Sequence, residues 1–290
     1  MSTAGIAPPP RKSFKELPWQ LWASQLAALL RIEIKKTLWM RRSIWIYLLA
    51  FAPTVMFGIH ALTSPMGRNC SIEEDTRVLA YTFQIFYLRV GIFFGCMGLF
   101  TWLFRGEIVE KSLHYYFLSP MRRELLVAGK FLAGLITTSL IFGASVLLCF
   151  TFAYGHFGAP GRAYVFSGPG LGQLGSYLLV TVLACLGFGS IFLALSLIFK
   201  NPIIPGVVVL LWESFHAVAP SLLQKFSVTF YLKQLSPVTI PPDGLMALFT
   251  VMAEPVSPWL AIPGLLLLSA AILVFAAYRI RRTEISYLAD

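Results

Sequence analysis

Long apolar runs recur along the whole of the 290-residue chain, and this feature limits the possible folds more than any other. Each run has about 20 residues, which in a helix rising about 1.5 Å per residue spans a hydrocarbon core of about 30 Å. Only 12% of the residues are charged, against about 25% in an average soluble domain. The sequence therefore predicts an all-α polytopic membrane protein and excludes an ordinary soluble enzyme.

Six segments have the length and polarity of a transmembrane helix. Their ranges are about 43–62, 80–104, 131–154, 174–199, 203–222 and 259–278. The loops rich in Arg and Lys all fall on one side, which the positive-inside rule assigns to the cytoplasm. We therefore expect a multi-pass protein of the cell membrane, with the bacterial inner membrane as the expected case and both termini in the cytoplasm. The net charge of +10 then reflects topology, and no nucleic-acid partner is predicted.

The segments that flank the membrane domain (43–279) have their own signatures. Residues 1–18 are Pro-rich without an apolar run, which predicts a disordered cytoplasmic tail, and 280–290 form a second tail. Residues 19–42 predict an amphipathic helix in the headgroup layer. On one arc of this helix lie Trp19, Trp22, Leu26, Leu29 and Ile32, and opposite lie Arg31, Lys35 and Arg42. Lys36 breaks the pattern. Residues 224–258 are aromatic and Pro-rich and predict a re-entrant segment in the outer leaflet.

Several kinds of chemistry have no sequence signature here. The Gly129–Lys130 pair is followed by Phe131 and does not form a phosphate loop, and no HExxH or GxSxG pattern occurs. The cysteines and the histidines are each spread over separate segments without metal-ligand spacing, so no catalytic, cofactor or metal site is predicted. These residues are Cys70, Cys96, Cys149, Cys185, His60, His114, His156 and His216. Glycines 95, 98, 187 and 189 indicate close helix packing.

The largest cationic loop, residues 105–130, has the pattern of a docking surface. A charged stretch with Glu107 and Glu110 is followed by an apolar and aromatic patch that contains Leu113, Tyr116, Phe117 and Leu118. Ser119–Pro120 then interrupts the helix, and Arg122 and Arg123 begin the next one. Aromatic anchors with a charged rim are typical of protein interfaces. An amphipathic loop that rests on lipid is the alternative.

The loop resembles the one between the second and third spans of ABC transporter type-2 permeases, the membrane subunits of type V ATP-binding-cassette exporters. The similarity falls on Glu110, Ser112, Leu113, Leu118, Ser119, Pro120, Arg123, Glu124, Gly129 and Lys130. Lys111 departs from the glycine that is usual before the hydroxyl residue. The order of an interfacial helix, six spans, a short turn between spans four and five and a re-entrant outer segment is also similar.

The resemblance implies a function and a set of partners. It implies the type V exporter fold and a transmembrane permease that moves a substrate with ATP hydrolysed by a separate ATPase subunit. ATP and Mg²⁺ would be bound by that subunit, and loop 105–130 would be the coupling loop that docks on it. The remaining expected partners are a second copy of the chain or a related permease, and membrane lipids. The chain itself would not be an enzyme.

Two ionisable residues lie near the middle of predicted spans, where each costs about 2.5–3.5 kcal/mol on insertion scales. Arg89 lies in span two and Glu213 in span five, at depths that predict an ion pair within one chain or across a dimer. His216 lies one turn from Glu213, and Gln84 lies near Arg89. These four residues either line a translocation path or fix the helix register.

Two other functions stay open at this point. An ion-coupled secondary transporter would use Glu213 and His216 and would need no ATPase. A membrane scaffold would use the cytoplasmic loop to recruit a partner without transport. The loop pattern favours the permease, but the sequence does not identify a substrate.

Overall fold

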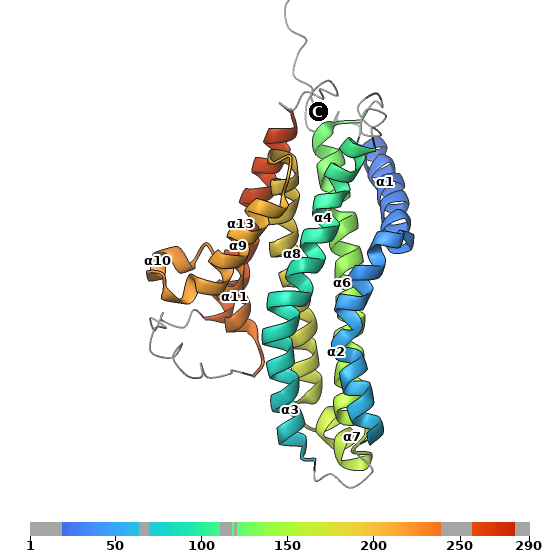
Figure 1. Cartoon of the computed structure of the whole chain (residues 1–290), viewed down its shortest axis with the longest axis vertical. Coiled ribbons are helices and arrows are strands. Elements are labelled where there is room, and N and C mark those ends of the chain that lie inside the picture. Colours follow the sequence, from blue (N-terminus) through green and yellow to red (C-terminus); the bar gives the residue numbers. More distant parts are fainter. Residues whose placement is uncertain (1–18, 64–69, 111–117, 119–120, 239–256, 282–290) are drawn as a thin grey trace, which may run out of the picture.

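The computed structural model describes residues 19–63, 70–110, 118, 121–238 and 257–281. Within this part of the chain every regular element is a helix. The helices long and apolar enough to cross a membrane are α2 (Ile44–Thr63), the continuous helix Ile72–Val109, α6 (Arg123–Gly155), α8 (Gly170–Ile198) and α13 (Pro258–Arg281). They form an elongated bundle (Figure 1). The structure therefore confirms an all-helical, membrane-embedded, multi-pass protein and five of the six predicted spans.

Two helices are much longer than the bilayer core. The helix over 72–109 consists of α3 (Ile72–Tyr81), the π-helical segment η4 (Thr82–Gly91) and α4 (Ile92–Val109). Its 38 residues span about 57 Å, and the 33 residues of α6 span about 50 Å. Both helices extend beyond the hydrocarbon core of about 30 Å. Their ends can therefore carry charged side chains outside the lipid.

Helix α8 lies at the centre of the bundle and packs against α4, α6 and α13. Three of the glycines noted in the sequence lie where helices of the bundle come close to one another. A Cβ atom on Gly95, Gly187 or Gly189 would come within 2.7 Å of a side chain of another helix, so the prediction of close packing is confirmed there. Gly98 differs, because a Cβ on this residue would meet no atom within 4 Å.

The predicted fifth span, 203–222, is wrong. The chain forms α9 (Ile203–Phe215) and then turns through the short helices η5 (His216–Val218), α10 (Ser221–Gln224) and α11 (Val228–Leu235). The 13 residues of α9 reach about 20 Å, too short for a bilayer. Pro220 favours an extended conformation for Ala219, which ends the helical path. This group of helices projects from one side of the bundle (Figure 1).

Helix α1 (Trp19–Trp39) lies along α6, at the end of the bundle that we call the α1 end. The opposite end carries α7 (Ala159–Phe166) and is called the α7 end. The short 3-10 helix η2 (Arg41–Ser43) joins α1 to α2. The face of α1 toward the bundle holds Leu29, Glu33 and Thr37, whereas Trp19 and Ile32 are exposed. The inner face is thus rotated from the predicted apolar arc and contains a carboxylate.

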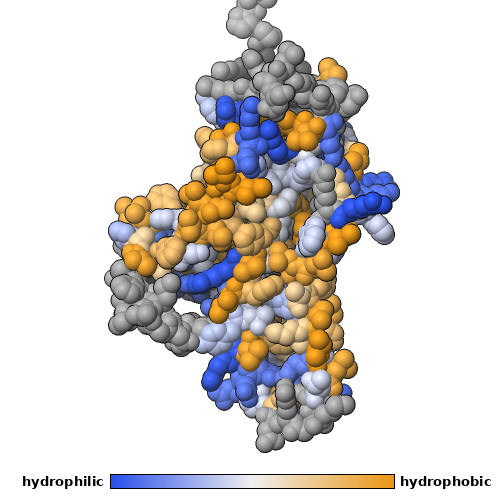
Figure 2. All heavy atoms as spheres, viewed as in Figure 1, coloured by the Kyte–Doolittle hydropathy of each residue, from blue (hydrophilic) through white to orange (hydrophobic). Residues whose placement is uncertain are grey.

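The surface has the polarity of a membrane protein. Figure 2 shows apolar side chains over the middle of the visible face and hydrophilic ones toward both ends. The exposed residues of α9 include Ile203, Ile204, Val207, Val208 and Leu211. This helix therefore presents an apolar face to lipid or to another membrane subunit.

Candidate functional site at the start of α6

A buried lysine connects three helices at the α1 end. The Nζ atom of Lys130, in the second turn of α6, lies 2.7 Å from Glu33 Oε1 of α1 and 2.7 Å from Glu107 Oε1 of α4. All three side chains are at most 2% exposed. Lys36 of α1 lies 3.3 Å from Glu107 and is 35% exposed. We call these four residues the lysine cluster.

The lysine cluster is electrically balanced, with two carboxylates and two ammonium groups. A buried charge is costly unless an opposite charge and hydrogen bonds compensate it. The ammonium group of Lys130 also lies 5.6 Å from the ring centroid of Phe104, within range of a cation–π attraction. Lys36, which breaks the amphipathic pattern of α1, takes part in this balance. The cluster therefore fixes the position of α1 against α4 and α6.

Gly129 allows α1 to come this close. A Cβ atom at this position would lie 2.4 Å from Leu29 Cδ2 and 3.2 Å from Leu26 Cδ1. The adjacent Gly129 and Lys130 thus act together, because Gly129 leaves room for α1 and Lys130 pairs with the Glu33 carboxylate of α1. The loop pattern included both residues. It could not show that Gly129 packs against α1 or that Lys130 pairs with carboxylates of α1 and α4.

The first turn of α6 contacts two further helices. The guanidinium carbon of Arg122 lies 4.4 Å from the ring centroid of Trp22 in α1. Arg123 donates hydrogen bonds to the carbonyl oxygens of Ile280 and Arg281 at the end of α13, where a cation is favoured by the helix dipole. Glu124 forms an ion pair with Arg281. We call the set of Arg122, Arg123, Glu124, Gly129 and Lys130 the α6 clamp, because it joins α1, α4 and α13.

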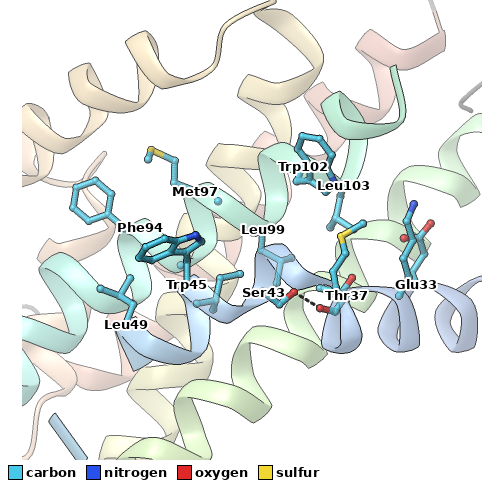
Figure 3. Close-up of a pocket in the computed structure, with 15 residues that line it drawn as sticks. Glu33, Thr37, Ser43, Trp45, Leu49, Phe94, Met97, Leu99, Trp102 and Leu103 are labelled. Carbon is cyan, nitrogen blue, oxygen red and sulfur yellow. Dashed lines mark hydrogen bonds between the residues drawn. The ribbon is translucent and has the colours of Figure 1, made fainter. Parts of the chain in front are cut away.

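An apolar pocket of about 510 Å³ lies next to the lysine cluster, between α4 and the junction of α1 and α2. Figure 3 shows Trp45, Phe94, Met97 and Leu99 around it, with Glu33 at one end. The lining residues also include Gly95, Gly98, Trp102 and Lys36. The pocket is thus apolar over most of its wall and charged at one end. This chemistry suits a guest with an apolar body and a polar head.

The structure corrects one residue of the predicted coupling loop. Glu107 was expected on an exposed docking surface, but its side chain is 2% exposed and belongs to the lysine cluster. The reason is that α4 continues to Val109, so Glu107 lies on the helix face that packs against α6. Glu110, Arg122 and Arg123 are exposed as expected. Leu113, Tyr116, Phe117 and Pro120 lie outside the described residues.

Glu213 has partners that the sequence did not indicate. Its carboxylate accepts hydrogen bonds from the Ser227 hydroxyl at 2.8 Å and from the backbone N–H groups of Val228 and Thr229 at 3.0 and 2.9 Å. The side chain is therefore placed at the N-terminus of α11, where the helix dipole favours an anion. Among the residues that the structure describes, no ion pair joins Glu213 to Arg89 as predicted. The turn after α9 brings α11 back to Glu213, and its donors satisfy the carboxylate instead.

The other predicted membrane residues lie around the same segment. Gln84 donates a 2.6 Å hydrogen bond to the carbonyl oxygen of Val238, and His216 Nδ1 lies 2.7 Å from the Glu213 carbonyl oxygen. Arg89, on η4, is exposed. Burial lowers the pKa of Lys233 on α11, and the nearby charge of Arg89 lowers it further. Arg89 is thus near enough to α11 for its charge to act on Lys233.

No protein-family model and no curated protein matches this chain. The resemblance to a known family therefore depends on the loop pattern alone.

Proposed function

We propose that this chain is the permease subunit of an ATP-binding-cassette exporter, with ATP hydrolysed by a separate partner subunit. The observation that supports this most is the α6 clamp. The residues that resemble the family pattern, from Arg123 to Lys130, join the start of α6 to α1, α4 and α13. A force applied to the loop before α6 would therefore reach three helices at once. Such a connection is what a subunit driven by an external ATPase requires.

In this proposal the α1 end faces the cytoplasm and the protein resides in a cell membrane, with the bacterial inner membrane as the expected case. The preceding loop would dock on the ATPase, which would bind ATP and Mg²⁺. A second copy or a related permease would complete the path. The large exposed apolar face of α9 offers one surface for that contact. In the type V exporter arrangement α9 would take the place of the fifth span.

The two alternatives have less support. An ion-coupled transporter would need Glu213 to exchange protons or ions, but three donors already hold its carboxylate at α11. A scaffold would need a docking loop but no connection from that loop through the bundle. The α6 clamp and the pocket beside it favour transport over passive recruitment.

Leu118 allows a direct test of docking, because it is 79% exposed in the predicted coupling loop. We expect Leu118→Asp to abolish co-purification of an ATPase subunit from the native host, as identified by mass spectrometry. The matched control is Leu171→Asp, since Leu171 is 51% exposed on α8 near the α7 end. Retention of the ATPase by Leu118→Asp, or the absence of any ATPase from the wild-type preparation, contradicts the proposal.

Gly98 allows a test of the pocket. Gly98 lines the pocket, and a Cβ atom at this position would meet no atom within 4 Å, so a leucine side chain here would extend into the pocket. We expect Gly98→Leu to keep the ATPase bound but to lower substrate-dependent ATPase activity. Gly172→Leu is the control, because a Cβ there also meets nothing within 4 Å and the residue is remote from the pocket. Equal activity of the two variants would remove the pocket from the path.

A further inference from the structure

Four side chains with metal-binding atoms meet at the α7 end, although they are far apart in the sequence. His60 lies near the end of α2, Cys70 precedes α3, Asp75 lies in the first turn of α3, and His156 follows α6. His60 Nε2 is 3.3 Å from Asp75 Oδ2 and 4.0 Å from Cys70 Sγ. His156 Nε2 is 3.6 Å from the same Asp75 oxygen. The ligand atoms of His60, Cys70 and His156 all lie within 4.8 Å of one another.

The protonation of His156 can be worked out from its hydrogen bond. Its Nδ1 atom lies 3.1 Å from the carbonyl oxygen of Phe152, and a carbonyl only accepts, so Nδ1 carries the proton. In a neutral ring Nε2 then has a lone pair, which is directed at the Asp75 carboxylate. A backbone carbonyl bound to the remote ring nitrogen is the usual second-shell contact of a metal-ligating histidine.

The contact between His156 and Asp75 is unfavourable unless a cation lies between them. Both side chains are more than nine-tenths buried, with exposures of 6% and 7%. Neither His156 Nε2 nor Asp75 Oδ2 has a hydrogen-bond partner within the described part of the chain. A buried lone pair facing a buried carboxylate oxygen costs free energy on both sides. A metal ion or a proton would remove that cost.

The two separations from Asp75 Oδ2, 3.3 Å to His60 and 3.6 Å to His156, are those of a tetrahedral metal site. Two bonds of about 2.0–2.2 Å at a tetrahedral angle place their ligand atoms about 3.3–3.6 Å apart, and a bond to sulfur of about 2.3 Å lengthens that separation. Imidazole nitrogen, thiolate sulfur and carboxylate oxygen together suit late first-row ions and Zn²⁺ in particular. A pocket of about 450 Å³, lined in part by Met56, Glu74 and Val78, adjoins the cluster. An ion can therefore reach it from the surface.

We infer that His60, Cys70, Asp75 and His156 form a binding site for a divalent transition-metal ion, with Zn²⁺ as the best fit. The bound ion would connect the ends of α2 and α6 to the start of α3. This site is independent of the proposed transport function and lies at the other end of the bundle from the α6 clamp. No spacing along the sequence signals this site, because it is the parallel packing of α2 and α6 that brings His60 and His156 together.

The test uses the full chain, purified in detergent, freed of metal with a chelator and dialysed against Zn²⁺ alone. We expect one tightly bound ion per chain. Loss of a second-shell group weakens metal binding by about 10–100-fold, so Asp75→Asn and His156→Gln, which remove ligands, should weaken it by more than about 100-fold. The matched control is Glu73→Gln, which removes the same charge from the same helix turn at an exposed side chain. It should bind Zn²⁺ like the wild type.

Co²⁺ provides a second measurement that does not depend on the buried residues. The wild type should show a thiolate-to-cobalt charge-transfer band that disappears in Cys70→Ser, a half-buried position where folding should be unaffected. Zn²⁺ binding that is absent, or equal in the ligand variants and Glu73→Gln, overturns the inference. A stability that changes with pH but not with Zn²⁺ also overturns it, since a shared proton would then occupy the cluster.

Discussion

Removing Lys130 should destabilise the chain more than any other single loss of charge at the α1 end. The substitution Lys130→Met keeps the length of the side chain but removes the ammonium group that lies between the buried carboxylates of Glu33 and Glu107. Breaking a buried ion pair by removing one partner costs about 3–5 kcal/mol. At about 2 °C per kcal/mol for a chain of this size, the melting temperature should fall by about 6–10 °C.

The assay is thermal unfolding of the purified chain in detergent, followed by tryptophan fluorescence. Lys35→Met is the matched control, because Lys35 is an exposed lysine on α1 and its removal should shift the melting temperature by less than about 2 °C. The triple variant Glu33→Leu, Glu107→Leu, Lys130→Met removes the three buried charges of the lysine cluster and should regain most of the stability. Lys36 then turns to solvent.

Two outcomes would refute this reasoning. If Lys130→Met melts within about 2 °C of the wild type, the carboxylates do not depend on the lysine. If the triple variant is as unstable as the single variant, the loss arises from packing and not from unpaired charge. A triple variant that folds but no longer couples ATP hydrolysis to transport would show that the lysine cluster transmits motion as well as fixing α1.

Three further predictions follow from the same structure. Gly129→Leu should detach α1, because even its Cβ would lie 2.4 Å from Leu29 Cδ2; limited proteolysis should then cleave α1 faster than in the wild type. In a double-mutant cycle, the losses of stability caused by Arg89→Leu and Glu213→Leu should add up within about 0.5 kcal/mol. Glu213→Leu alone should cost about 1–3 kcal/mol, because it leaves the hydrogen-bond donors of Glu213 unpaired. A coupling energy above about 1 kcal/mol would indicate a contact across a dimer. Arg89→Leu should also raise the pKa of Lys233 toward its ordinary value, because the Arg89 charge lowers it. Only the neutral amine reacts with an acylating reagent, so the pH profile of Lys233 acylation, followed by mass spectrometry, should move to higher pH. An unchanged profile would contradict the proximity of Arg89 to Lys233.

The sequence alone was sufficient for the class of protein and for most of the helices. Whether a segment such as 174–199 is a membrane helix depends on its own length and apolar content, and these are local properties. The end of α9 also has a local cause. Pro220 interrupts the helix, but the prediction gave more weight to the apolar composition of 203–222 and extended the span through it. The loop pattern also placed Gly129, Lys130 and Arg123 among the important residues before any partner was known.

Only the tertiary structure decided which residues meet. Glu33 resembles any other charge on an amphipathic helix until α1 packs on Gly129 and brings it to Lys130. Glu213 was predicted at the same membrane depth as Arg89, but the chain turns back after α9 and the N-terminus of α11 binds the Glu213 carboxylate instead. His60 and His156 are 96 positions apart in the sequence and become neighbours through the packing of α2 on α6. Partners of this kind depend on lateral packing and helix rotation, which hydropathy and spacing along one segment do not encode.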